Sequence, residues 1–379
     1  MMPDRLKVGS PIGLWVLVTA CQVPTAVTPC RFDSDCPAEY FCDPIGAYCL
    51  SRGAAPDAGA DRVVVEDAGL SPDRHRFWTR VADADQPGGL HGPKAAFHRA
   101  LGQVMLYGGS TDVDWGPYSA ALWRYDGTAW TCECAACAPG PRWGHGLVYD
   151  AAGDRLLLYG GRADGTSSTS DLWEWTEAGG FVQLYPSGAS PAPRHGMYAA
   201  YDEARDRMVV FGGRRADIGA TSDLWEYDGG QWHQIATTVP WPTRRFDSGQ
   251  VATYDRLGRG FVIYAGDNGS GGVRDDMWSW DGVAWAQRCG ACTGADRLAP
   301  GFAYDGTTGR IVMQGGFTTD EEAGTWESRG AGFVLVDPIW PTARDTAALV
   351  YDERRGVFVL YGGNRDGSGG NLAETYEYR

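Results

Sequence analysis

Two CxxC pairs are the residues whose type and spacing most directly suggest chemistry. Cys134 and Cys137 recur, at the same distances from a preceding tryptophan, as Cys289 and Cys292. Two such pairs ordinarily suggest one tetrahedral zinc site, whereas in an exported protein each pair can close a local disulfide. A redox role would need a thioredoxin-like strand–helix–strand context, which these segments lack. We therefore predict two local disulfides.

Arginines recur seven residues before the tyrosine of a Tyr-Asp pair in four parts of the sequence. A guanidinium presents a planar fork of donors that matches a carboxylate, so these arginines predict a site for acidic ligands. The alternative is that each arginine pairs with a carboxylate of its own repeat or the next one. The third repeat offers Arg244 or Arg245, slightly displaced, and the first has none. The candidate binding residues are Arg142, Arg194, Arg297 and Arg344.

The elements that must position these residues are six copies of an apolar strand that ends in a glycine pair. The first glycine stands at positions 108, 160, 212, 315 and 362, and alanine takes its place at 265. Intervals of 52, 52, 53, 50 and 47 residues are typical of a propeller built from short strands. In the second copy, strand a covers 145–150, strand b ends at the glycine pair, strand c covers 171–175 and strand d lies around 181–184.

Glycine pairs after an apolar strand, followed by Asp-Leu-Trp and a further aromatic residue, resemble the kelch repeat over about residues 77–379. The resemblance implies an all-β, six-bladed β-propeller in which strand a is innermost. It also places the arginines beside the central channel, where eukaryotic kelch adaptors bind acidic peptides. The galactose-oxidase-like copper enzymes share such a propeller and imply an enzymatic alternative with His145 and His195 near the channel. No tyrosine–cysteine constellation accompanies these histidines, so we expect no metal and no cofactor.

The spacing of aromatic residues predicts how the ring closes. An aromatic residue opens strand d seven or eight residues after the strand c tryptophan in five repeats. The sixth repeat has Tyr376 in strand c, and the sequence stops at Arg379, before a strand d. Trp78 and Trp130 each stand 30 residues before a glycine pair. We therefore predict that residues 77–81 supply the outer strand of the last blade.

The first twenty residues resemble a bacterial lipoprotein signal peptide. Arg5 and Lys7 precede an apolar run over 12–20 that is too short to span a bilayer, and residues 18–21, Val-Thr-Ala-Cys, resemble a lipobox. The resemblance implies acylation of Cys21 and attachment to the bacterial cell envelope, at the outer membrane or cell surface. The alternative is an ordinary secretory signal whose cysteine is incidental.

Three further segments follow this signal. Residues 21–50 predict a small module with two disulfides in any of three pairings, residues 51–75 a flexible Ala/Pro/Asp/Gly linker, and residues 76–379 the propeller. A zinc site is the rival interpretation of the module, although it contains no CxxC. With Cys21 modified, nine of the ten cysteines remain, so Cys132 is either free or exchanges with the Cys134 pair. The module cysteines are Cys30, Cys36, Cys42 and Cys49.

Charge and composition narrow the function. A formal net charge of −15 without a basic stripe argues against nonspecific nucleic-acid binding. We expect an envelope-anchored, non-catalytic protein whose loops bind a protein or carbohydrate ligand, with the loop aromatics Trp115 and Tyr118 as candidate contacts. The alternative is a copper enzyme or a hydrolase with its site at the channel mouth. The fold by itself does not choose between these classes.

Overall fold

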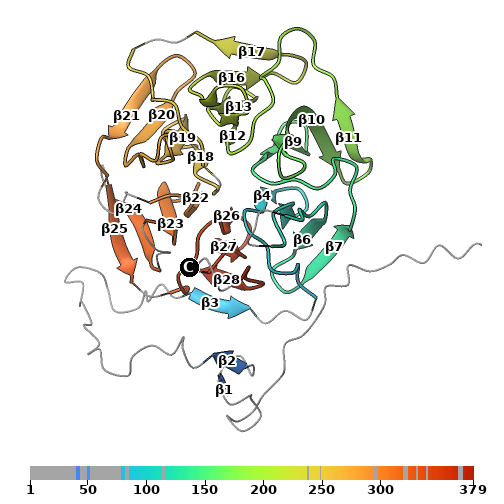
Figure 1. Ribbon diagram of the computed structural model, residues 1–379, viewed down its shortest axis with the longest axis vertical. Coiled ribbons are helices and arrows are strands. Elements are labelled where there is room, and N and C mark those ends of the chain that lie inside the picture. Colours follow the sequence, from blue (N-terminus) through green and yellow to red (C-terminus); the bar gives the residue numbers. More distant parts are fainter. Residues whose placement is uncertain are drawn as a thin grey trace, which may run out of the picture.

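The computed structural model describes residues 40–42, 49–51, 78–81, 85–112, 116–236, 239–247, 249–292, 297–318, 323–329, 332–338, 340–365 and 370–379 (Figure 1). Every named element in this part of the chain is a β-strand, and six four-stranded sheets follow one another around a ring. The predicted all-β, six-bladed propeller is therefore confirmed. No helix within the described ranges is long and apolar enough to cross a membrane.

The blades follow one another in chain order, from blue-green through green, gold and orange to red (Figure 1). Blade 1 contains β4 (Lys94–His98), β5 (Gln103–Tyr107), β6 (Leu122–Tyr125) and β7 (Trp130–Cys134). Blade 2 contains β8 (Gly146–Asp150), β9 (Arg155–Arg162), β10 (Ser168–Thr176) and β11 (Gly180–Leu184). Blade 3 contains β12 (Tyr198–Asp202), β13 (Arg207–Phe211), β16 (Leu224–Tyr227) and β17 (Trp232–Ile235), with the hairpin β14 (Arg214–Arg215) and β15 (Gly219–Ala220) between its strands b and c.

The second half of the ring repeats this pattern. Blade 4 contains β18 (Ala252–Asp255), β19 (Gly260–Tyr264), β20 (Met277–Trp280) and β21 (Trp285–Cys289). Blade 5 contains β22 (Gly301–Asp305), β23 (Arg310–Gln314), β24 (Thr325–Arg329) and β25 (Gly332–Asp337). Blade 6 contains β26 (Ala348–Asp352), β27 (Val357–Tyr361), β28 (Thr375–Tyr378) and β3 (Trp78–Val81). A separate two-stranded sheet pairs β1 (Tyr40–Cys42) with β2 (Cys49–Ser51).

Strand β3 closes the ring. It pairs antiparallel with β28 over its whole length, and its blue arrow lies beside the red blade in Figure 1. The Trp78 indole donates a hydrogen bond to Thr325 Oγ1 of blade 5 at 2.6 Å, and the Trp130 indole of blade 1 donates in the same way to Thr375 Oγ1 of blade 6 at 2.8 Å. β3 is therefore the strand d of blade 6, as the aromatic spacing predicted.

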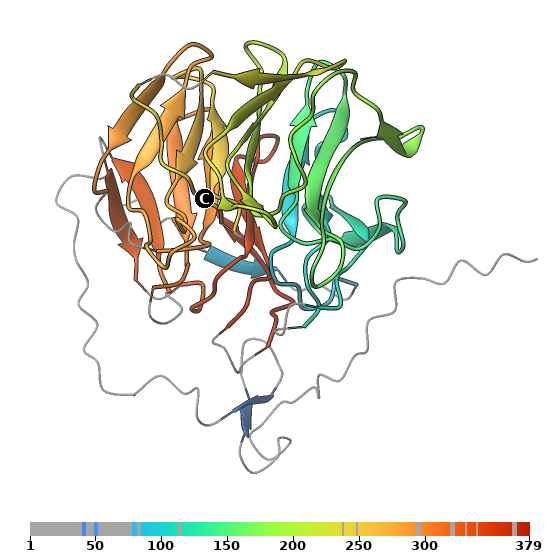
Figure 2. The same cartoon turned by 45° about the horizontal axis from the view of Figure 1, so that its top comes forward.

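The hydrophobic core is divided among the junctions between blades. Six clusters of buried side chains each combine residues of two neighbouring blades. In one of them, Val104 and Leu106 of blade 1 pack with Val357 and Val359 of blade 6. Because neighbouring blades cover both faces of strand b, that strand is a continuous apolar run rather than an alternating one. Figure 2 shows the blades packed side by side around the ring.

The glycine pairs follow strand b at a contact between neighbouring blades, except that in blade 2 strand β9 continues through its pair to Arg162, past the predicted end. In blade 3 the Gly213 N–H donates to the Arg245 carbonyl of blade 4 at 2.9 Å, and a Cβ on Gly212 would lie 2.6 Å from the same oxygen. The φ angles of the two glycines are 64° and 94°, in the region that L side chains rarely adopt. The pairs are thus structural. We call the face that carries the b–c loops and d–a connections the loop face, and the opposite one, with the a–b and c–d turns, the turn face.

Candidate functional site

The predicted arginines lie inside the walls of the propeller, where none is more than 4% exposed. Arg194 represents the group. Its two terminal nitrogens donate to the two carboxylate oxygens of Asp223, each at 2.8 Å, and one of them also donates to the Gly212 carbonyl at 2.9 Å. The corresponding ion pairs are Arg142–Asp171, Arg245–Asp276 and Arg344–Glu374. Arg245 therefore belongs to blade 4, because its partner Asp276 directly precedes β20, and not to the third repeat as the sequence suggested.

These contacts correct the expectation that Arg142, Arg194, Arg297 and Arg344 bind an acidic ligand. Each side chain is held by groups of its own blade, and Arg297 donates to the Gly315 carbonyl at 3.0 Å and covers the Trp326 ring. Burial alone would raise the pKa of Asp223, but hydrogen bonds and charge from Arg194 lower that pKa to about 2. The carboxylate partner is therefore ionised, and the pair joins strand b to strand c.

Blade 1 replaces the arginine and its carboxylate together. Leu90 occupies the arginine position, because its carbonyl accepts the N–H of Gly363, the second glycine of blade 6. Ala121 stands where the carboxylate begins strand c in blade 2, and it packs against the cluster that contains Leu90. The same space is thus filled by two apolar side chains in this blade.

Four ring-bearing side chains surround the channel opening on the loop face. They stand one residue after the arginine position in blades 1 to 4, and the centroids of successive rings are 6.1, 5.8 and 6.5 Å apart. We call this arc the collar. Sequence reasoning missed it because its members differ in residue type, so that their shared position was the only available signal. The collar residues are His91, Trp143, His195 and Phe246.

Two arginines supply positive charge beside the collar. Arg214 is exposed, with its guanidinium carbon 5.3 Å from the Phe246 ring centroid, and Arg162 is half-buried. Burial, together with the charges of Arg162 and Arg214, lowers the pKa of His195 to about 4. The His195 Nδ1 lies 2.9 Å from Ser168 Oγ. At neutral pH the positive charge near the collar therefore resides on the arginines and not on this histidine.

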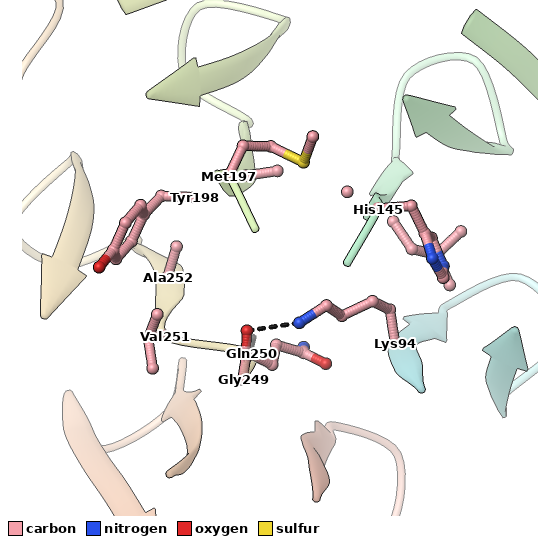
Figure 3. Close-up of a pocket in the computed structure, with 11 residues that line it drawn as sticks. Lys94, His145, Met197, Tyr198, Gly249, Gln250, Val251 and Ala252 are labelled. Carbon is pink, nitrogen blue, oxygen red and sulfur yellow. Dashed lines mark hydrogen bonds between the residues drawn. The ribbon is translucent and has the colours of Figure 1, made fainter. Parts of the chain in front are cut away.

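Deeper in the channel, residues from opposite blades meet. The Lys94 ammonium of blade 1 donates to the Gly249 carbonyl, which precedes strand a of blade 4 (Figure 3). The Gln250 side chain accepts from the Ala95 N–H at 3.1 Å and donates to the Ala95 carbonyl at 2.9 Å. We call Lys94, Ala95, Gly249 and Gln250 the crossbar. Its residues bridge the channel between the two blades.

A ring of four alternating charges bridges the channel at the turn face. Arg99 pairs with Glu203 and, at 3.1 Å, with Glu353, while Arg256 pairs with Glu353 and, at 2.8 Å, with Glu203. These residues occupy one equivalent position, in the a–b turns of blades 1, 3, 4 and 6. A cavity of about 140 Å³ is lined both by crossbar residues and by this ring.

The predicted local disulfides Cys134–Cys137 and Cys289–Cys292 are both present. Cys132 is disulfide-bonded as well, so the expectation that it is free or exchanges with Cys134 was wrong. Among the residues that the structure describes, no cysteine is free. The same residues include no group of three or more His, Cys, Asp or Glu side chains placed to hold a metal ion.

The loop aromatics differ from the expectation. Tyr118 is only 9% exposed and so belongs to the wall of the propeller rather than to its binding surface. Trp115 lies outside the described residues, as do Cys21, Cys30 and Cys36. Cys42 and Cys49 are opposite each other in the register of β1 and β2.

Comparisons with curated proteins reveal partial relatives. The chain is 32% identical over 117 residues to "Dynein regulatory complex subunit 7" of Chlamydomonas reinhardtii, which covers 30% of this chain and 10% of that protein. It is 31% identical over 169 residues to "Dynein alpha chain, flagellar outer arm" of the same organism, and this match covers 39% of this chain and 3% of that protein. It is 32% identical over 156 residues to human "Multiple epidermal growth factor-like domains protein 8", and this match covers 38% of this chain and 5% of that protein. The chain thus spans a tenth or less of these relatives.

A solved structure and a family model complete the comparison. The structure titled "Structure of YjhT" superposes with a TM-score of 0.60 at 13% identity, over 76% of this chain and 95% of that one, and so shares the fold. The model described as "KLHDC2/KLHL20/DRC7 Kelch-repeats domain" matches residues 96–287, half of the chain. With six blades that each carry the glycine-pair position and an inner strand a, this chain belongs to the kelch-repeat family.

Proposed function

We propose that this protein is a non-catalytic binding protein that holds a protein partner on the loop face, beside the collar. The observation that carries the proposal is a group of accessible side chains on blades 3 and 4. It combines the half-buried rings of His195 and Phe246, the exposed Arg214, and Ile218, which is 60% exposed between β14 and β15. Aromatic and arginine side chains dominate the binding energy of protein interfaces.

The charge distribution and the relatives support a protein ligand. The chain carries a net charge of −15, so the arginines beside the collar form a local positive patch that favours an acidic surface on the partner. Two of the relatives are, by name, a subunit of a dynein regulatory complex and a dynein chain, that is, members of protein assemblies. A carbohydrate that stacks on the collar rings is the other ligand class that the same surface suits.

We test the interface with the double variant Arg214→Glu/Ile218→Asp in the full chain. The variant reverses the charge at position 214 and replaces the apolar side chain at position 218 with a carboxylate. We therefore expect the affinity for protein partners retained from extracts of the source cells to fall at least about tenfold, which corresponds to about 1.4 kcal/mol of binding free energy. Affinity is measured by titration of each retained protein. The matched control is Val283→Asp, at a residue 80% exposed in a c–d turn on the turn face. Equal loss in both variants would contradict the proposal, and glycan-array binding that only the double variant loses would identify a carbohydrate ligand instead.

We also propose that the chain is exported and anchored to the cell envelope through an acylated Cys21, with residues 21–50 as a small disulfide module and 51–75 as a linker. The disulfides of the propeller support an oxidising compartment. Mass spectrometry of the protein isolated from its membrane fraction should show a diacylated N-terminal Cys21, and Cys21→Ser should move the protein to the soluble fraction. An unmodified, internal Cys21 in the membrane-associated protein would contradict the anchor without affecting the binding proposal.

A further inference from the structure

Cys132, in strand d of blade 1, is disulfide-bonded, and the cysteines of the propeller leave it no partner there. The propeller sequence contains four other cysteines, and these are bonded to each other as Cys134–Cys137 and Cys289–Cys292. Of the ten cysteines in the sequence, five therefore remain as candidate partners of Cys132, and all of them precede residue 50. The five candidates are Cys21, Cys30, Cys36, Cys42 and Cys49.

A β-bulge separates Cys132 from the CxxC pair that follows it. The register of β6 and β7 shifts by one residue between Leu122 and Trp123, which makes Glu133 the extra residue of β7. A bulge of one residue turns the side chains on its two sides to opposite faces of the sheet. Cys134 accordingly packs against the cluster shared with blade 2, and Cys132 against the cluster shared with blade 6. The two sulfur atoms therefore serve different faces of the blade.

Cys132 lies at the contact between blades 6 and 1, where β3 closes the ring, and we call this contact the seam. The side chain is half-buried, and Val81 of β3 packs against the same cluster. β3 and β7 are the outer strands of the two blades that meet at the seam. The five N-terminal cysteines all precede Trp78, the first residue of β3. The chain that carries them thus joins the propeller on the same side of the ring as Cys132.

We propose that a disulfide joins Cys132 to one of the five N-terminal cysteines and so attaches the N-terminal segment to the outer edge of blade 1. The bond forms when the two thiols lose two protons and two electrons to a disulfide-donating oxidant of an oxidising compartment. The propeller is then attached to its N-terminal segment at two points of the seam, through the backbone at Trp78 and through the sulfur of Cys132.

The place of this bond decides which side of the propeller is held. Blades 6 and 1 form the seam, whereas blades 3 and 4 lie on the opposite side of the ring (Figure 1). His195, Phe246 and Arg214 of the proposed partner surface therefore stand away from the two attachment points. This consequence rests on the proposed function, but the bond itself does not, and the test below requires no partner.

Peptide mapping of the full chain tests the bond directly. The protein is denatured with N-ethylmaleimide and without reductant, and is then digested with trypsin. Cleavage after arginine places Cys132 in the peptide 125–142, together with Cys134 and Cys137, and divides the N-terminal cysteines between peptides that end at Arg31 and Arg52. We expect peptide 125–142 to be linked to one of these two peptides and to separate from it on reduction.

Fragmentation of the linked pair identifies the partner. A link to Cys30 or to the peptide that ends at Arg52 is compatible with an acylated Cys21. A link to Cys21 would support the bond and contradict the acylation proposed above, because one sulfur atom cannot carry both. The unreduced protein should also run as a single chain on a denaturing gel, as the bond lies within one copy.

Two single variants provide a matched comparison. In Cys132→Ser, maleimide should label one further thiol, and that thiol should lie in a peptide that ends at Arg31 or Arg52. In the control Cys289→Ser, the further thiol should be Cys292, its partner in the propeller. The mapping of the unmodified chain does not depend on either variant folding. A maleimide-labelled Cys132 in that chain, or a bond between Cys132 and a second copy, would overturn the proposal.

Discussion

Removal of residues 1–81 should lower the melting temperature by at least about 10 °C, while removal of 1–75 should leave the propeller nearly as stable as the full-length chain. The longer truncation deletes β3 and exposes the edge of β28. It also removes the Trp78 ring, which contacts Tyr376 and Tyr378 at centroid distances of 6.4 and 4.9 Å. Trp78 is half-buried, so its loss should cost less than the about 3–5 kcal/mol typical for truncation of a fully buried tryptophan, and the loss of the β28 pairing adds to it.

The two truncations share the loss of every cysteine before the propeller, so their difference reports β3 alone. Differential scanning calorimetry of both forms measures it. The Trp78 indole also bonds Thr325 of blade 5, and so the longer truncation should loosen two blades rather than one. Equal melting temperatures for the two truncations would contradict closure by β3.

Replacement of Arg194 by leucine should lower the free energy of unfolding by about 3–5 kcal/mol, because it leaves the Asp223 carboxylate without its partner in a mostly buried position. The double variant Arg194→Leu/Asp223→Ala should recover all but about 1–2 kcal/mol. The chain itself provides the precedent, since blade 1 has Leu90 and Ala121 at these two positions. Urea unfolding of the two single variants and the double variant measures the coupling.

The linkage sign for Asp223 adds a second readout. Its pKa in the folded state is lowered to about 2, below the ordinary pKa of an aspartate, so the stabilisation it contributes is present above pH 4 and is lost as the pH falls toward 2. The double variant should therefore lose less stability than the wild type between pH 4 and pH 2. Additive effects of the two substitutions, with an unchanged acid response, would show that the pair does not act as a unit.

Much of the architecture could be predicted because its causes are local. A strand b that is apolar on both faces must be covered on both, and a glycine pair at its end permits the close approach of Gly213 to the Arg245 carbonyl. Six such strands at a period near fifty predict six blades. The spacing between the aromatic residues of strands c and d is also local, because a short turn within one blade sets it. That spacing showed that the last blade lacked the aromatic residue of its strand d and identified Trp78 as that residue.

The candidate site could not be predicted in the same way. The arginines had two interpretations, and the choice depended on whether Arg194 and Asp223, 29 residues apart, face each other inside the wall. The sequence position of Lys94 gave no hint of a contact with Gly249, 155 residues away. Tyr118 was predicted to be a surface residue because it lies in a loop between strands b and c, yet the fold buries it.

The sequence by itself therefore determined the repeat, the number of blades, the closing strand and the CxxC disulfides, all of which follow from side chains close together along the chain. Only the tertiary structure decided that the arginines are structural, that His91, Trp143, His195 and Phe246 form a collar, and that Lys94 meets blade 4 across the channel. The physical reason is that contacts across a ring depend on how many blades close it and how far each strand a stands from the axis. No local pattern of residues encodes those distances.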